Sequence, residues 1–517
     1  MAFDSFADAR SFADDPGLEA DICIMGAGAA GITLASALAD SGLRVCLLEA
    51  GGMDMDPVVE DASIVPDIGR PYDVTANRLR FFGGATNHWG GHCVRLEPDD
   101  FEPKDWIPMS GWPFGADTLA PYYRQAHAFL GLGEYEYDPA PVARALGTRL
   151  MPFDGPMLKS QLSRYRRVFY GDEYGPRLDK AANVRVVLYA DVCDIRLGEA
   201  SGETVSHVVV RSPAGNRFDV RARYFVLAAG GIEIPRMLLV ANGQRPAGLG
   251  NENDLVGRYF QEHLMFKSGL LLPRDPADVL PLYLSEVPYG EIAVRCHLVL
   301  TAEAVRARRI GKFRSEFYSL PLRLRDLRAL RSGRIDAADI AGLVSDPFGT
   351  ARAYRCGSNA RHDTYGLFNN IEQMPNPASR VSLRADKDAY GRPQAQLDWQ
   401  ITRQDHDCIL AAHQVIAQEA GRIGFGRMRI EIDPEPEVFL DGVGGGGHHM
   451  GTVRMAEDPR RGVTDGDGRL HSVENLYVAG SALFPTGGYP NPTLTITAMA
   501  FRLSDHLKAR AEREGLL

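Results

Sequence analysis

Residues 21–52 read DICIMGAGAAGITLASALADSGLRVCLLEAGG, and this stretch decides the fold. Residues 21–25 form an apolar strand that runs into a glycine turn, and an alanine-rich helix follows to about Ala39. A second apolar strand over 44–50 closes a βαβ unit, with Glu49 near its end. These elements stand in the order of a Rossmann unit, so the sequence predicts a dinucleotide-binding domain.

Three glycines give the turn its GxGxxG spacing, and each has a physical task. Gly26 permits the tight turn, Gly28 lets the backbone approach a pyrophosphate, and Gly31 allows the helix to pack closely. The N-terminus of the helix holds the phosphates, and Glu49 binds the ribose hydroxyls. The pattern therefore predicts both the class of ligand and the residues that contact it.

Length and composition limit the alternatives. The chain has 517 residues, of which 45% are hydrophobic and 24% charged, and its net charge is −10. A chain of this length exceeds what one hydrophobic core usually supports, so we expect two domains or a two-lobed unit. The acidic balance argues against a nucleic-acid-binding protein, whose affinity would depend on a basic face.

The first residues and the cysteines bear on the cellular compartment. Residues 1–20 lack the basic and apolar regions of a secretory signal, which predicts a cytoplasmic location. No uninterrupted apolar stretch reaches the roughly 18 residues that a membrane helix needs. The seven cysteines are scattered without CxxC pairs, which predicts neither a disulfide framework nor a zinc site.

The C-terminal region favours FAD over NAD as the dinucleotide. A strand over 476–479, a turn at Gly480 and Ser481, and a helix from about Thr493 follow one another there. FAD proteins of the glutathione-reductase type use such a late strand and helix to cover the ribityl chain and the flavin. The strand over 224–231, YFVLAAGG, fits the same plan because it ends in small residues.

Motifs in order along nearly the whole chain resemble those of the glucose-methanol-choline (GMC) oxidoreductases. They are GAGAAGITLASALA (26–39), GGATNHWGG (83–91), AAGGIEIPRMLLVAN (228–242), VGRYFQEHL (256–264), EQMPNPASRVSL (372–383), HHMGTVRM (448–455), NLYVAGSALFP (475–485) and NPTLTITAMA (491–500). Within the family, GWPFGADTLAPYY (111–123) and NPTLT look most like pyranose oxidases, glycoside 3-oxidases and bacterial sugar dehydrogenases.

The resemblance implies a fold of α/β plus α+β class with a defined domain order. A Rossmann-like FAD-binding domain over 17–265 would include a loop region, 60–182, that covers the flavin. A substrate-binding domain with an antiparallel sheet would span 266–441. Residues 442–517 would return to the FAD-binding domain and carry the catalytic residues.

The implied reaction oxidises a secondary alcohol of a sugar or glycoside by hydride transfer to the flavin. The hydroxyl proton needs a base, and a neutral imidazole suits this task. The family's catalytic positions fall on His448 and Asn491, and His449 is expected to be a structural neighbour. Asn491 can both donate a hydrogen bond to a sugar hydroxyl and accept one. The adjacent histidines do not predict a metal, because no carboxylate or cysteine lies at ligand spacing.

The glycine-rich loop FFGGATNHWGG would lie against the flavin. In pyranose oxidases, the histidine before the loop's tryptophan is joined to the 8α-methyl group of the flavin, and His88 occupies that place before Trp89. The flanks differ here, with Asn87 before and two glycines after, so non-covalent packing of His88 on the flavin edge is the alternative. The predicted cofactor contacts are Gly26, Gly28, Ala29, Gly31, Glu49, Ala50, Gly84, Asn87, His88, Val192, Ala229, Gly480, Ser481, Asn491 and Thr493.

Several questions of function stay open at this point. A non-sugar natural-product alcohol, a flavin-containing lyase like the hydroxynitrile lyases, and a non-catalytic flavin-binding subunit are alternatives to sugar oxidation. The sequence does not distinguish oxygen, a quinone and a cytochrome as the electron acceptor. The arginine-rich segment 306–334 suggests either a solvated helical face or a dock for an acidic partner, a membrane surface or a second copy.

Overall fold

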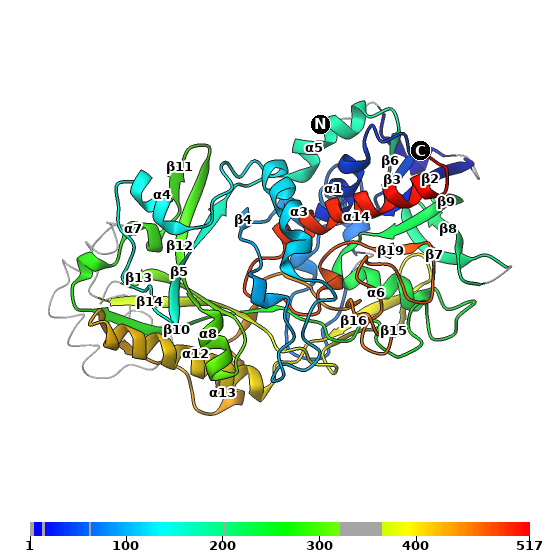
Figure 1. Cartoon of the computed structure of the whole chain (residues 1–517). Helices are drawn as coiled ribbons and strands as arrows, with labels where there is room; N and C mark the ends of the chain where they lie inside the picture. Colours follow the sequence, from blue (N-terminus) through cyan, green and yellow to red (C-terminus); the bar gives the residue numbers. More distant parts are fainter. Residues whose placement is uncertain (1–4, 13–15, 62–63, 200–201, 321–363) are drawn as a thin grey trace.

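The computed structural model describes residues 5–12, 16–61, 64–199, 202–320 and 364–517. In this part of the chain, two large sheets form two lobes that lie side by side (Figure 1). The predicted combination of a Rossmann-like lobe with an antiparallel-sheet lobe is confirmed. No helix of the described residues has both the length and the apolar composition to cross a membrane.

The first sheet has a parallel core with an antiparallel extension at one edge. Its strands, as far as the structure describes them, follow the order β1-β6-β3-β2-β9-β8-β7, with β19 also paired to β9. Their bounds are Ala7–Asp8 (β1), Val184–Leu188 (β6), Val45–Leu48 (β3), Leu18–Met25 (β2), Arg217–Leu227 (β9), Val205–Arg211 (β8), Asp191–Leu197 (β7) and Leu476–Val478 (β19).

The register of this sheet brings the predicted nucleotide-binding residues together. Met25, the last residue of β2, lies opposite Leu48 on one side and Leu227 on the other. Leu227 also pairs with Val478 of β19. Because these parallel strands end at one level, the segments that follow them meet at the carboxyl edge, where α/β sheets bind their ligands.

Helices cover this sheet, and the apolar side chains of the helices and the sheet form one hydrophobic core. The long α14 packs against α1 and α3, which Figure 1 shows beside it, and α5 packs against α1. The bounds are Ala29–Leu38 (α1), Pro57–Asp61 (α2), Ala116–Phe129 (α3), Tyr170–Lys180 (α5), Gly230–Val240 (α6) and Thr493–Arg513 (α14).

The second sheet is antiparallel throughout its described pairings. Its order is β17-β10-β14-β13-β12-β5-β4, with β11 beside β12 and β18 beside β10. Its strands are Gly426–Arg429 (β17), His263–Pro273 (β10), Thr364–Glu372 (β14), Phe313–Leu320 (β13), Ile292–Leu300 (β12), Leu158–Tyr165 (β5), His92–Cys93 (β4), Val287–Tyr289 (β11) and Gly444–Gly445 (β18).

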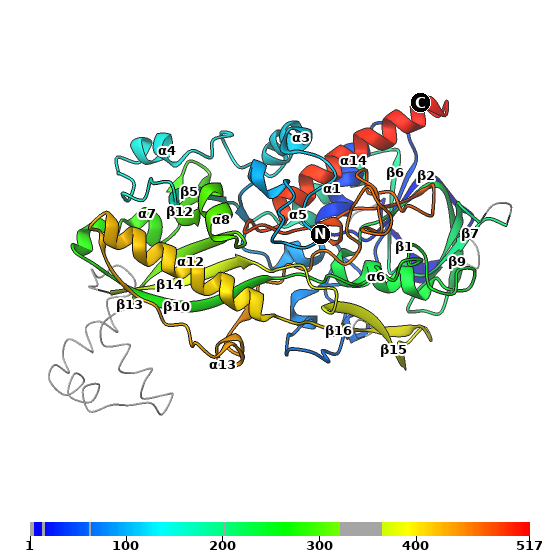
Figure 2. The same cartoon turned by 60° about the horizontal axis from the view of Figure 1, so that its bottom comes forward.

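One long helix, α12, lies across a face of the second sheet, as Figure 2 shows. Its N-terminus is closed by a capping box, in which Thr402 and Asp405 bond each other's backbone N–H groups. The remaining helices near this sheet are Pro139–Ala145 (α4), Pro281–Leu284 (α7), Ala302–Arg308 (α8), Arg403–Arg422 (α12) and Pro436–Leu440 (α13).

The lobes do not follow the predicted division of the chain in every segment. Strands β4 and β5 fall within 60–182, expected to be a loop region of the FAD-binding domain, yet they pair in the second sheet. Conversely, the hairpin β15–β16 (Arg380–Lys387 and Pro393–Asp398) falls within 266–441 but packs against α6 of the first lobe. β5 pairs with a strand distant in sequence, whereas β15 and β16 pair with each other and pack on α6; linear domain bounds encode neither contact.

The described part of the arginine-rich segment, up to residue 320, is not one solvated face. Arg306 and Arg309 form exposed ion pairs with Glu102 and Asp105, respectively. Lys312, just before β13, and Arg314 within it are both buried, and so are their neighbours Phe313 and Ser315, so this end of the strand is covered on both faces. Residues 321–334 lie outside the described residues, so the docking prediction stays a prediction for that half.

Candidate functional site

A cavity of about 450 Å³ joins the glycine turn of the first lobe to the predicted catalytic residues. Gly26 and Gly28 of the turn line it, and so do His448 and Asn491. The other predicted residues that line it are Ala29, Glu49, Ala50, Gly84, His88, Val192, Ala229, Gly480, Ser481 and Thr493. The residues chosen from separate motifs thus surround one space.

Gly31 and Asn87 do not line this cavity. A Cβ atom on Gly31 would lie 1.9 Å from the carbonyl oxygen of Gly26, so this glycine allows the helix to pack against the turn. The side chain of Asn87 donates to the carbonyl oxygen of Phe82 at 3.1 Å. Asn87 therefore holds the backbone of the glycine-rich loop, and its contact with the cofactor stays a prediction.

Glu49 fixes the backbone of the glycine turn as well as facing the cavity. Its carboxylate accepts hydrogen bonds from the N–H groups of Ala27, at 2.8 Å, and Gly51, at 3.1 Å. Burial raises the pKa of this carboxyl, and the two hydrogen bonds oppose that rise. Gly28 shows the fit to a bound group, because a Cβ atom there would meet nothing within 4 Å and would extend into open space.

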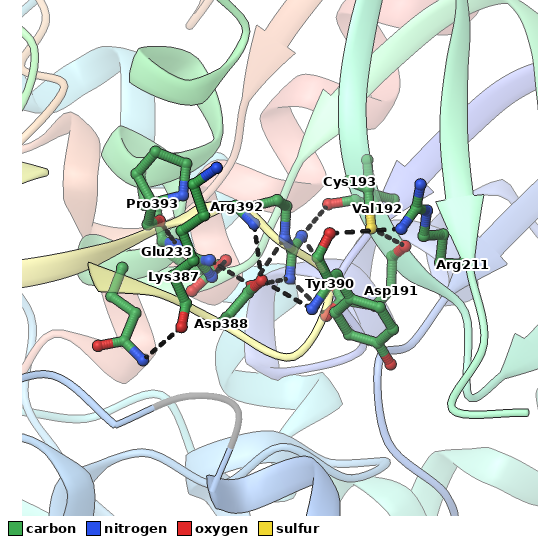
Figure 3. A network of polar contacts seen from close by, with 12 residues as sticks. Asp191, Val192, Cys193, Arg211, Glu233, Lys387, Asp388, Tyr390, Arg392 and Pro393 are labelled. Atoms are coloured by element: carbon green, nitrogen blue, oxygen red, sulfur yellow. Dashed lines mark hydrogen bonds and ion pairs between the residues drawn. The ribbon is translucent and has the colours of Figure 1, made fainter. Parts of the chain in front are cut away.

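A network of arginines and carboxylates forms the wall beside the turn, and sequence reasoning missed it. Figure 3 shows Arg392, from the turn between β15 and β16, bonded to both Asp388 and Asp191. Arg80 also pairs with Asp191, at 2.9 Å, and lines the cavity. Its Nη1 atom is buried without a partner in the described chain, which suits an oxygen of a bound ribose or phosphate.

At the other end, His448 lies against a second buried histidine. The Nδ1 atoms of His448 and His263 are 2.8 Å apart, and Nε2 of His263 lies 2.9 Å from the carbonyl oxygen of Gly488. Burial, followed by the charge of Arg314, lowers the pKa of His263 to about 3. Burial also lowers the pKa of His448 well below its ordinary value, with smaller effects of His263 and Arg314. Both imidazoles are therefore neutral near pH 7.

The loop that carries His448 is held by one buried carboxylate. Glu262 accepts hydrogen bonds from the backbone N–H groups of His448, Gly446 and His263, and from the hydroxyl of Tyr72. Burial raises the pKa of Glu262 to about 7, although these hydrogen bonds lower it. This residue positions the catalytic loop from β10 without lining the cavity.

Asn491 is oriented by two donors behind the cavity. Nη1 of Arg314 lies 3.5 Å from its side-chain oxygen, and Nδ2 of Asn370 lies 3.4 Å from the same atom. An arginine can only donate, so the oxygen of Asn491 accepts from Arg314. The sequence allowed Asn491 to donate and to accept, and its role toward a substrate stays a prediction.

The two remaining histidines of the motifs have different surroundings. Nε2 of His449 lies 3.1 Å from the hydroxyl of Tyr72, and its carbonyl oxygen accepts from the hydroxyl of Ser481, so it is tied into the fold. His88 lines the cavity, and burial lowers its pKa. The neighbouring Trp89 donates its ring N–H to the carbonyl oxygen of Val168 at 2.8 Å.

Sequence reasoning missed the residues that position the predicted ones. Glu262 and His263 stand in the motif VGRYFQEHL, whose charged residue and histidine inside an apolar strand were a signal that could have been used. Arg314 lies in the segment interpreted as a solvated face or a dock. The role of this buried cation could be recognised only through its partners His92 and Asn491, which are distant in sequence.

Comparison with known proteins shows which proteins this chain is similar to. Residues 375–500 match the family model described as GMC oxidoreductase. The chain is 28% identical to paromamine 6'-oxidase of Streptomyces fradiae, over 93% of this chain and 90% of the relative. It is 25% identical to C-glycoside 3-oxidase of Microbacterium trichothecenolyticum, over 82% of this chain and 74% of the relative.

A solved structure supports the fold over almost the whole chain. A variant of the formate oxidase of Aspergillus oryzae, studied for FAD modification, superposes with a TM-score of 0.57 at 18% identity. The match covers 98% of this chain and 100% of that chain.

The fold and the matches define an α/β oxidoreductase that acts on CH–OH groups. The family match is carried by residues 375–500, and the relatives extend the similarity over most of the chain. The predicted resemblance to the GMC oxidoreductases and the predicted enzyme class are thereby confirmed, and FAD is the cofactor that the sequence predicted.

Proposed function

We propose that this protein is an FAD-dependent oxidoreductase that oxidises a secondary alcohol of a sugar or glycoside, with His448 as the base and Asn491 as the hydrogen-bond donor. The observation that carries the proposal is that His448 and Asn491 line the same cavity as the glycine turn at Gly26 and Gly28. The relatives named as a paromamine oxidase and a C-glycoside oxidase support a sugar-derived substrate.

FAD fits the residues at the nucleotide end. Gly28 leaves the space that a pyrophosphate needs, Glu49 is placed for ribose hydroxyls, and Arg80 has a buried N–H group to offer an oxygen. When bound, FAD supplies the two-electron acceptor for the hydride that leaves the substrate carbon.

The chain's own residues handle the proton and the oxygen. The neutral imidazole of His448 accepts the proton of the substrate hydroxyl while the carbon loses its hydride, so the alcohol becomes a carbonyl. The amide N–H of Asn491 donates to the same oxygen as negative charge develops on it. Together the two residues orient the C–H bond that breaks.

The carboxylates that line the cavity are engaged within the protein. Among the described residues, the carboxylates that line it are Glu49, Asp191 and Glu233. Glu49 is engaged by backbone N–H groups, and the other two by arginines. None is left to bind an ammonium group, and the buried cation of Arg314 lies behind Asn491.

Anaerobic mixing with a panel of alcohols tests the proposal. We expect sugars or glycosides to bleach the flavin absorbance, and the panel includes amino sugars because one relative is named as a paromamine oxidase. Turnover without bleaching would instead identify a lyase. If no sugar or glycoside bleaches the flavin but another alcohol does, the substrate is a non-sugar natural product.

A further inference from the structure

We infer that His263 is a positioning residue that selects the tautomer of His448 in which Nδ1 carries the proton and Nε2 is free to act as base. The inference deepens the proposed function and rests on it for the role of His448 as the base. It assigns a task to a histidine that does not line the cavity and that touches neither the glycine turn nor Asn491.

The hydrogen bond between His263 and Gly488 determines which ring nitrogen of His263 carries the proton. Its Nε2 atom lies 2.9 Å from the carbonyl oxygen of Gly488, which can only accept a hydrogen bond. Nε2 of His263 therefore carries a proton. Since burial keeps this imidazole neutral, its Nδ1 has no proton and presents a lone pair.

The lone pair of His263 then decides the state of His448. The two Nδ1 atoms are 2.8 Å apart, so one of them must donate, and His263 cannot. His448 therefore donates from Nδ1, and its Nε2 is unprotonated. The reversed tautomer would set two lone pairs against each other inside the protein and would leave His448 without a free acceptor.

Buried carboxylates hold both ends of the hydrogen-bonded chain that runs from Gly488 through His263 to His448. At one end, Glu372 accepts the backbone N–H of Gly488 at 3.1 Å and so fixes the carbonyl to which His263 donates. At the other end, Glu262 accepts the backbone N–H groups of both His263 and His448. The rings meet edge to face, with centroids 4.9 Å apart and planes at 78°. The geometry needed for tautomer selection is thus built from the backbone outward.

The direct test is nitrogen NMR of the holoprotein labelled with ¹⁵N-histidine. The signals of His448 are identified by their loss in the variant His448→Gln. We expect one protonated and one unprotonated nitrogen on His448, with the proton on Nδ1. A proton on Nε2, or a doubly protonated ring at neutral pH, would overturn the inference. This measurement needs no substrate, so it is decided even if no alcohol reduces the flavin.

Variants of His263 test the consequence for the reaction. His263→Phe fills the space but offers no acceptor, and His263→Gln keeps an oxygen that can accept. We expect the flavin-reduction rate of His263→Phe to fall about 10²-fold or more, with FAD still bound, and that of His263→Gln to recover in part.

A matched control separates this role from the cost of losing any buried histidine. His413 of α12 is equally buried and bonds Ser268 and the carbonyl oxygen of Ile409, away from the cavity. His413→Phe should reduce its flavin at the parental rate. A parental rate in His263→Phe, or no difference between its Phe and Gln variants, would contradict the inference. Should His263→Phe fail to fold, the NMR result and the Gln variant still decide.

Discussion

The side-chain oxygen of Asn491 faces the guanidinium of Arg314, whose Nη1 atom lies 3.5 Å from it. Because arginine has no acceptor, this relationship determines how Asn491 meets a substrate. We therefore expect the amide nitrogen to donate to the substrate, since a donor beside the base is what a developing alkoxide needs. Arg314 itself is 2% exposed and forms a 3.2 Å ion pair with Glu316, so its position is fixed by the second sheet.

Substitution of Asn491 should show whether donation is its role. Asn491→Ala should slow flavin reduction about 10²-fold, the usual cost of one donor to a developing oxyanion. Asn491→Asp should slow it further, because a carboxylate is drawn to Arg314 and offers no N–H to the substrate. Anaerobic stopped-flow spectroscopy measures both rates. Equal rates in the Asp variant and the parent would refute the donor role.

His448→Ala should retain bound FAD and lose flavin reduction by about 10²- to 10⁴-fold, more than Asn491→Ala, because a base is lost as well as an orienting group. The absorbance spectrum reports FAD, and stopped-flow mixing with a substrate reports the rate. Reduction at the parental rate would require another base, and His449 would be the first to examine.

The pH dependence of the reaction follows from the lowered pKa of His448. Burial disfavours the charged imidazolium, so the competent neutral form persists as the pH falls through 6.5, the ordinary value for histidine. We expect the flavin-reduction rate to stay constant through pH 6.5 and to fall only at more acidic pH. Circular dichroism at each pH checks that the fold is intact. A decline with an apparent pKa near 6.5 would show that His448 is solvated in solution.

Glu262 offers a test of how the catalytic loop is held. In Glu262→Gln, an NH₂ group replaces one carboxylate oxygen, so it faces backbone N–H groups that can only donate. It should lower the free energy of unfolding by about 1–3 kcal/mol. Tyr72→Phe removes only one donor and should cost about 0.5–1.5 kcal/mol. Denaturant titration of the two holoproteins compares them, and equal costs would mean that the backbone bonds to Glu262 contribute little.

The glycine turn yields a matched pair of variants. At Gly28 a Cβ atom meets nothing within 4 Å, whereas at Gly31 it would lie 1.9 Å from the Gly26 oxygen. Gly28→Val should therefore fold but lose FAD, because its side chain takes the space of the pyrophosphate. Gly31→Ala should be unstable through a clash within the protein. Flavin absorbance and thermal unfolding distinguish the two, and a yellow, fully loaded Gly28→Val protein would contradict the cofactor assignment.

The success of prediction from this sequence depended on how local each signal was. The turn at Gly26 and the acid Glu49 belong to one βαβ unit, so strand and helix periodicity sufficed to place them. His448 and Asn491 came from the resemblance to the family, since a histidine in a glycine-rich loop has no chemical signature of its own. The pairing of residues 185 positions apart, as in His263 and His448, leaves no trace in local periodicity.

The same limit explains the misreading of the arginine-rich segment. Charge density suggested a solvated face or a dock, but Arg314 lies on a strand whose neighbours are β12 and β14. Around Arg314 the strand is buried on both faces inside the assembled lobe, and its pairing partners are distant in the chain or beyond a turn. Only the assembled sheet shows that this cation belongs to the site.

The last prediction concerns His88, which lines the cavity at the end of the glycine-rich turn Gly84–Asn87. Burial lowers the pKa of its imidazole, so the ring is neutral near pH 7 and has a nucleophilic nitrogen. We propose that a ring nitrogen of His88 bonds to the carbon of the flavin's 8α-methyl group, with loss of one hydrogen from each atom. The two electrons released would reduce the flavin, which an external acceptor such as oxygen would reoxidise, and the bond would raise the flavin's potential and prevent its loss. Acid precipitation of the purified protein should then leave yellow colour in the pellet, and the intact mass should exceed that of the polypeptide by one flavin adduct. His88→Ala should release its flavin under the same treatment while still binding it before denaturation. If all the colour of the parent stays in the supernatant and its mass equals the bare polypeptide, His88 only packs against the flavin.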